Sequence, residues 1–161
     1  ADICRKVTVS PLKKAMNKIH LGKLTYVLIA LKLLIQYKPC PVSIRINKQE
    51  TTSLSKFFFI TGMNMPYEGG GVKFCPQANF QDNLLDICMI GNLSKLKILA
   101  LFPTAFIGKH GRFRGVTLTN CKRIDISSKS PLPIHCDGES MGIADHLILQ
   151  STQKQINVII K

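Results

Sequence analysis

Carboxylates are the scarce and therefore informative side chains of this sequence. The 161 residues include 22 Lys and Arg but only nine Asp and Glu. Four of the acids fall in two short segments: Asp82 and Asp86 in residues 75–90, and Asp137 and Glu139 in residues 134–140. A carboxylate at a turn can bind a hard cation such as Mg²⁺, or it can accept the proton of an attacking hydroxyl group.

The segment Asp137-Gly138-Glu139 has a composition typical of a turn between two strands. The simpler interpretation is a plain β-hairpin. In the alternative interpretation, rigid flanking strands present Glu139 to a cleft, where it acts as a general base. Spacing alone leaves both interpretations open.

The pair Asp82-Asn83 also predicts a turn, because Asn tolerates the left-handed backbone region in place of Gly. Asp82 as a simple turn-former is again the simpler interpretation. One carboxylate with neighbouring backbone carbonyls and water would suit Mg²⁺, but it would be a poor transition-metal site.

Several other sites are not supported by the sequence. The segment Tyr67–Gly71 contains three successive glycines but matches neither GxGxxG nor GxxxxGK[ST]. The six cysteines form no CxxC motif and no Cys–His pair with zinc-ligand spacing. Reduced cysteines used as small apolar residues are the simpler interpretation, which favours a reducing, cytoplasmic compartment.

The net charge of +13 predicts a partner that carries phosphate: nucleic acid, anionic lipid or a phosphorylated ligand. A nucleic acid is not the expected partner. Aromatic residues make up 7% of the chain, and the run Phe57-Phe58-Phe59 is more typical of a core than of a stacking platform.

These candidate sites would be positioned by a mainly β fold. Residues 11–38 are expected to be helical, with a break at His20–Gly22. The apolar run 24–37 is shorter than a bilayer requires and contains Lys32. A further helix is expected at 95–106, capped by Ser94 and kinked by Pro103. Strands are expected at 42–47, 54–60, 72–74, 84–90, 116–119, 123–127, 132–136, 146–149 and 156–160.

This order of elements predicts one domain over residues 1–161, with a helical segment at 1–40 and a β-rich body at 41–161. The fold class is an antiparallel β-sandwich with N-terminal helices and one inserted helix.

Taken in order, the motifs resemble the C-terminal domain of the diacylglycerol kinase-like lipid kinases, the superfamily that includes sphingosine and ceramide kinases. The resemblance covers most of the chain. Its motifs are GKLTY (22–26), the triple glycine (69–71), PQA (76–78), DNLLD (82–86), GKH (108–110) and DGE (137–139).

The resemblance implies a two-domain enzyme that uses ATP to phosphorylate a lipid hydroxyl group. In that family a separate N-terminal domain with a Gly-Gly-Asp-Gly-Thr signature binds ATP. These 161 residues lack that signature, so the chain is not expected to transfer phosphate alone.

The resemblance also implies roles for individual residues. Glu139 would be the catalytic base, and Asp137 and Gly138 would shape the turn that positions it. Asp82 would bind Mg²⁺ together with Asn79 and the backbone carbonyl of Leu84. The family usually has Asp-Gly where this chain has Asp82-Asn83.

The implied partners are a lipid substrate, the N-terminal nucleotide-binding domain and the anionic inner face of a membrane, contacted peripherally from the cytoplasm. A homodimer is compatible with these features. The alternative from another class is a non-catalytic lipid- or phosphate-binding β-sandwich module.

Overall fold

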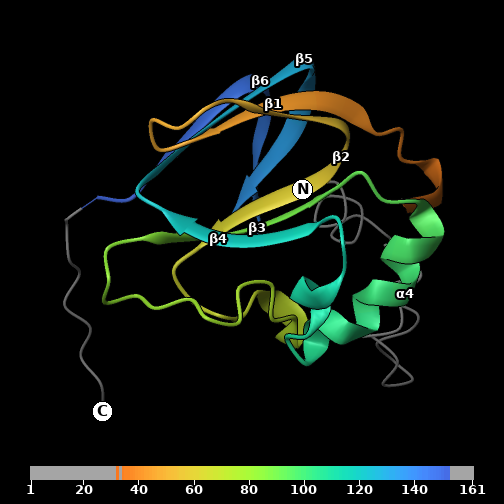
Figure 1. Cartoon of the computed structure of the whole chain (residues 1–161), viewed down its shortest axis with the longest axis horizontal. Helices are drawn as coiled ribbons and strands as arrows, with labels where there is room; N and C mark the ends of the chain where they lie inside the picture. The colour runs from red at the N-terminus through yellow and green to blue at the C-terminus, as the bar shows by residue number, and fades with distance from the viewer. Residues whose placement is uncertain (1–31, 33, 153–161) are drawn as a thin grey trace.

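The computed structural model describes residues 32 and 34–152. Six antiparallel strands form one sheet in the order β4-β3-β2-β1-β5-β6 (Figure 1). The strands are β1 (Cys40–Ile46), β2 (Thr52–Met63), β3 (Leu85–Gly91), β4 (Val116–Cys121), β5 (Arg123–Cys136) and β6 (Glu139–Gln150). One α-helix, α4 (Lys95–Phe106), and two short 3₁₀ turns, η1 (Gly69–Gly71) and η2 (His110–Arg112), lie between them.

The sheet curls so that its two ends face each other. Strands β2 and β6 are separated in the sheet by β1 and β5. Nevertheless, Leu149 of β6 lies so close to Gly62 of β2 that a Cβ atom on the glycine would be 3.1 Å from Leu149 Cδ1. The observed fold is therefore mainly β and sandwich-like, which confirms the predicted fold class.

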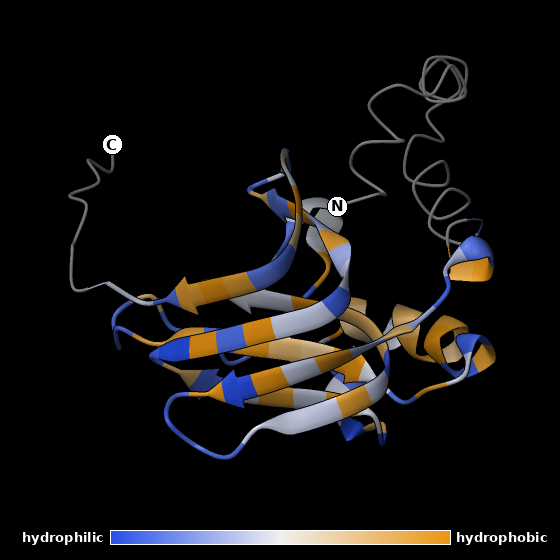
Figure 2. Cartoon of the chain, turned by 90° about the horizontal axis from the view of Figure 1, so that it is seen from above, coloured by the Kyte–Doolittle hydropathy of each residue, from blue (hydrophilic) through white to orange (hydrophobic). Residues whose placement is uncertain are grey.

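Alternating apolar residues fill the interior of the curl. Val42 and Ile44 of β1, Ile87 and Met89 of β3, and Ile124 and Ile126 of β5 are all buried. Residues two apart point to the same face of a strand, so each pair contributes to one common core. Figure 2 shows the resulting alternation of hydrophobic and hydrophilic residues along the strands.

Helix α4 covers the opposite face of β3. Leu101 of α4 packs with Ile90 and Leu93 in a second buried cluster, so β3 is buried on both faces. Ser94 begins the helix, and its Oγ accepts a hydrogen bond from the Lys97 backbone N–H. The prediction of a Ser94-capped helix at 95–106 is confirmed.

Some predicted strands were wrong. Residues 72–74 do not form a strand; Val72 makes only an isolated bridge to Glu68. The strands expected at 123–127 and 132–136 are one strand, β5, with a register shift between Ser127 and Leu132. The intervening residues are accommodated as a bulge, so the chain continues as one strand there. Most of the helical segment expected at 11–38, and the strand expected at 156–160, lie outside the described residues.

In the described part of the chain, no helix is long and apolar enough to cross a bilayer.

Candidate functional site

The Asp137-Gly138 turn presents Glu139 at the tip of the β5–β6 hairpin. Cys136 pairs with Glu139, which leaves Asp137 and Gly138 as the only two turn residues. Their φ angles are 48° and 88°, as in the tight hairpin turns whose twist matches that of the strands. Glu139 is the first residue of β6 and is exposed, so its carboxylate is available to a ligand.

A second segment holds this hairpin in place. His135 Nε2 lies 3.2 Å from Glu68 Oε1. Glu68 directly precedes the glycines of η1, and its backbone N–H donates to the Val72 carbonyl at 2.9 Å. The glycine segment is thus closed on itself and linked by one side-chain contact to His135, two residues before the hairpin turn.

Sequence reasoning missed Glu68 and His135. The available signal was an acid beside the glycine run in a chain that has only nine acids. Nothing in the sequence indicated that this acid contacts His135, which is 67 residues away.

The loop before β3 is folded around Asn79 and Asp82. Asp82 Oδ1 accepts a hydrogen bond from the Leu84 N–H at 2.9 Å, and Asn79 Oδ1 accepts one from the Gln81 N–H at 3.0 Å. Asn83 has a φ of 58°, so it adopts the left-handed backbone region that Asn and Gly tolerate. The Asp82-Asn83 turn is confirmed.

Asp86 belongs to the same loop system and was not assigned a role from the sequence. Its carboxylate accepts a hydrogen bond from the Asn79 backbone N–H, and its pKa is raised by burial and by the nearby Asp82 charge. Its Oδ2 atom is buried and has no hydrogen-bond partner among the described residues. The loop therefore gathers two carboxylates that interact electrostatically.

This set of donors suits a hard cation. Carboxylate, amide and backbone carbonyl oxygens are the ligands that Mg²⁺ accepts. The described residues contain no cluster of three His, Cys, Asp or Glu side chains that could hold a metal, so a cation here would depend on Asn79 and the Leu84 carbonyl as well as on carboxylates. The unpartnered Asp86 oxygen beside Asp82 is a feature that a bound cation would compensate.

The two candidate sites do not meet within this domain. The Asn83 carbonyl accepts a hydrogen bond from Ser151 Oγ at 2.7 Å, which places the Asp82 loop beside the end of β6. Glu139 begins the same strand, and the twelve residues of β6 correspond to about 36 Å of chain. The Asp82 loop and Glu139 therefore lie at opposite ends of β6.

Comparisons with known proteins match nearly the whole chain. The family model of the YegS C-terminal, NAD kinase beta sandwich-like domain matches residues 9–159. A Bacillus subtilis (strain 168) protein, provisionally named as lipid kinase YtlR, is 32% identical over 142 residues, which cover 88% of this chain and 46% of the relative. A diacylglycerol kinase of Mycobacterium tuberculosis (strain ATCC 25618 / H37Rv) is 30% identical over 118 residues, which cover 73% of this chain and 38% of the relative.

Solved structures agree on the fold. A crystal structure of a diacylglycerol kinase from Bacillus anthracis str. Sterne superposes with a TM-score of 0.55 at 23% identity, over 83% of this chain and 45% of that one. At this identity the likeness concerns the fold alone. The chain spans less than half the length of each of these relatives.

Proposed function

The chain belongs to the family of YegS C-terminal, NAD kinase beta sandwich-like domains, and from this premise we propose that it is the catalytic-base and lipid-substrate domain of an ATP-dependent lipid kinase. The names of its relatives, lipid kinase and diacylglycerol kinase, support this proposal. Because the chain corresponds to less than half of those relatives, ATP would be bound mainly by a separate N-terminal domain. The domain alone would not transfer phosphate.

The observation that carries the proposal is the exposed carboxylate of Glu139 on a hairpin held by the His135–Glu68 contact. In the proposed reaction the lipid hydroxyl oxygen attacks the terminal phosphorus of ATP, and the bond from that phosphorus to ADP breaks. Glu139 accepts the proton of the attacking hydroxyl group. Asp137 and Gly138 set the direction of the carboxylate through their tight turn.

Mg²⁺ would be bound by Asp82, Asn79 and the backbone carbonyl of Leu84. A bound cation supplies positive charge that reduces the repulsion between Asp82 and Asp86. These residues would hold the loop before β3 in one conformation, and the Asn83–Ser151 hydrogen bond would connect it to β6.

The substrate hydroxyl group would come from a diacylglycerol-like lipid taken from the cytoplasmic face of a membrane. The net charge of +13 favours peripheral contact with an anionic surface.

The first prediction concerns Glu139→Gln in the full-length protein, assayed for transfer of labelled phosphate from ATP to diacylglycerol in mixed micelles. Loss of the base should lower turnover by at least about 100-fold. The midpoint of thermal unfolding should not change, because the side chain is exposed. Glu50→Gln, which removes an equally exposed charge after β1, is the matched control and should keep full activity.

Full turnover in the Glu139→Gln protein would remove this residue from the mechanism. Lipid binding by a wild-type protein that phosphorylates nothing would instead favour a non-catalytic binding module.

A further inference from the structure

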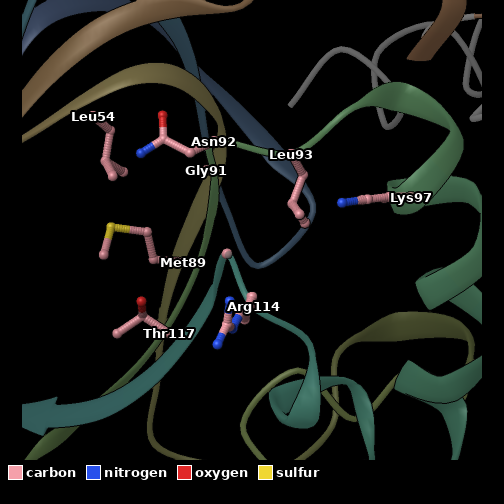
Figure 3. A pocket seen from close by; sticks show the side chains of 9 residues that line it. Leu54, Met89, Gly91, Asn92, Leu93, Lys97, Arg114 and Thr117 are labelled. Carbon is pink, nitrogen blue, oxygen red and sulfur yellow. The ribbon is translucent and has the colours of Figure 1, made fainter.

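A cavity of about 420 Å³ lies where β3, the start of α4 and the segment before β4 meet (Figure 3). It is distinct from the hairpin and the loop described above, since it contains neither Glu139 nor Asp82. Two basic side chains reach it from different elements: Lys97 extends from the first turn of α4, and Arg114 comes from the segment between η2 and β4.

The charges at this cavity are not compensated. None of its lining residues is acidic. Both cations are exposed, and the ion pairs seen between described residues, Arg123–Asp125 and His135–Glu68, involve neither of them. Lys97 also lies within the first turn of a 12-residue helix, where the positive end of the helix dipole favours an anion.

Asn92 adds a polar side chain to the lining. Its Oδ1 accepts hydrogen bonds from Ser55 Oγ at 3.0 Å and from the Lys56 N–H at 3.2 Å. These contacts fix the orientation of the amide. Lys97 and Arg114 supply two positive groups to this lining, and positive groups form the strong hydrogen bonds to phosphate oxygens.

Glycines make the cavity a fixed feature of the fold. Gly115 has a φ of 93°, and a Cβ atom there would lie 2.7 Å from the Gly91 carbonyl oxygen. Any side chain at Gly115 would therefore push Arg114 and the start of β4 away from β3. This close backbone approach fixes the segment that carries Arg114 against β3, at one side of the cavity.

Apolar groups beside the cations indicate what carries the phosphate. Leu54, Met89 and Leu93 share the lining with Lys97 and Arg114. Leu96, the residue before Lys97, is 78% exposed, and Leu99 is 44% exposed. A free anion gains nothing from exposed leucines, whereas a lipid headgroup brings apolar chains to the same place.

We infer that this cavity binds the phosphate group of an anionic lipid headgroup, with the exposed leucines of α4 directed toward the bilayer. The inference rests on the membrane contact in the proposed function and assigns that contact to a defined site. It is tested by binding alone, without nucleotide, so its failure is separate from failure of the kinase assignment.

The test measures binding of the full-length protein to vesicles of phosphatidylcholine with and without phosphatidylglycerol, by co-sedimentation. The Lys97→Gln/Arg114→Gln variant should bind the anionic vesicles at least about tenfold more weakly than the wild type. The matched control is Lys48→Gln/Lys129→Gln, which removes the same charge from exposed positions outside the cavity and should bind nearly as well as wild type. Circular dichroism should show equal thermal stability for all three proteins.

Equal weakening in both double variants would overturn the inference, because binding would then depend only on net charge. The second part of the test measures competition by inorganic phosphate for the vesicle-bound protein. Phosphate could release the protein from the anionic vesicles at a concentration that does not release it from other anionic surfaces. That result would assign the cavity to free phosphate and overturn the lipid assignment. Retention on vesicles in that phosphate supports the lipid assignment.

Discussion

At the scale of single residues, burial decides which ionisable groups can carry charge. His110 is completely buried, and its Nε2 lies 3.0 Å from the Phe74 carbonyl and 3.6 Å from Cys88 Sγ. Since a carbonyl only accepts, Nε2 carries the hydrogen, and the unprotonated Nδ1 is buried without a partner among the described residues. Burial therefore lowers the pKa of His110 from its usual 6.5, although the bond to Phe74 opposes the shift.

The pH dependence of stability follows from the direction of this shift. The unfolded chain takes up a proton at His110 as the pH falls through about 6.5, whereas the folded protein resists protonation until a lower pH. Stability should therefore be complete above pH 6.5 and decrease as the pH falls below it. Thermal unfolding at pH 7.5 and 5.5 should show a smaller loss for His110→Gln than for wild type, because Gln does not ionise. Gln can still donate a hydrogen bond to the Phe74 carbonyl, so the variant should fold. Equal losses in the two proteins would contradict this prediction, because the two proteins differ only at position 110.

The buried cysteines follow the same rule. Burial raises the pKa of Cys75 and of Cys88 to about 12, so both remain neutral thiols at physiological pH. The five cysteines in the described residues are free, and Cys75, Cys88 and Cys121 are buried. Their positions in the structure agree with the interpretation of these residues as small apolar groups.

At the scale of elements, the loop before β3 is stabilised by side-chain oxygens that accept hydrogen bonds from backbone N–H groups. Asp82 and Asn79 each accept a hydrogen bond from a backbone N–H two residues later. Such contacts stabilise a turn without any regular secondary structure. The chain therefore enters β3 in a fixed direction, which positions Asp86 as the second residue of that strand.

Asp82→Ala should weaken this loop in two ways. It removes the acceptor for the Leu84 N–H, which we expect to lower stability by about 1 kcal/mol and the unfolding midpoint by roughly 2–4 °C. It also removes the carboxylate of the proposed Mg²⁺ site, so added Mg²⁺ should raise the unfolding midpoint of wild type but not of the variant. Elemental analysis of the dialysed protein measures metal occupancy directly.

Asp82→Asn is the matched variant for this experiment, since it keeps the hydrogen-bond acceptor and removes the charge. It should retain most of the loop stability and lose the response to Mg²⁺. An unchanged response to Mg²⁺ in both variants would exclude Asp82 as a ligand.

At the scale of the whole molecule, the curl of the sheet brings β6 over β2. Gly62 does not have a positive φ, so the backbone conformation does not require glycine at this position. Its lack of a side chain matters for packing instead. Leu149 Cδ1 occupies the space where a side chain at position 62 would begin. The shape of the molecule therefore depends on a small residue paired with a large one on strands that are not neighbours in the sheet.

A double-mutant cycle tests this arrangement. Gly62→Ala should destabilise the wild-type protein, because the added methyl group crowds Leu149. The same change should be less harmful, or even stabilising, in a Leu149→Ala background, where it fills part of the space left behind. We expect a coupling energy of about 0.5–3 kcal/mol from urea unfolding. Additive effects would show that β6 does not pack on β2.

The sequence by itself determined the elements with strong local signals. Three kinds of signal depend on preferences within a few residues. They are the alternating residues of β1, the Ser94 cap of α4, and the turns at Asp82-Asn83 and Asp137-Gly138. The strand expected at 72–74 was wrong because Val72 has no strand beside it and bridges back to Glu68 instead. Local alternation cannot indicate whether a partner strand is available.

Only the tertiary structure decided which of these elements meet. Three features depend on strand register and on the curl of the sheet. They are the contact of His135 with Glu68, the placement of Glu139 and the Asp82 loop at opposite ends of β6, and the presence of Lys97 and Arg114 in the lining of one cavity. Those features result from packing summed over the whole chain, so no short stretch of sequence contains them.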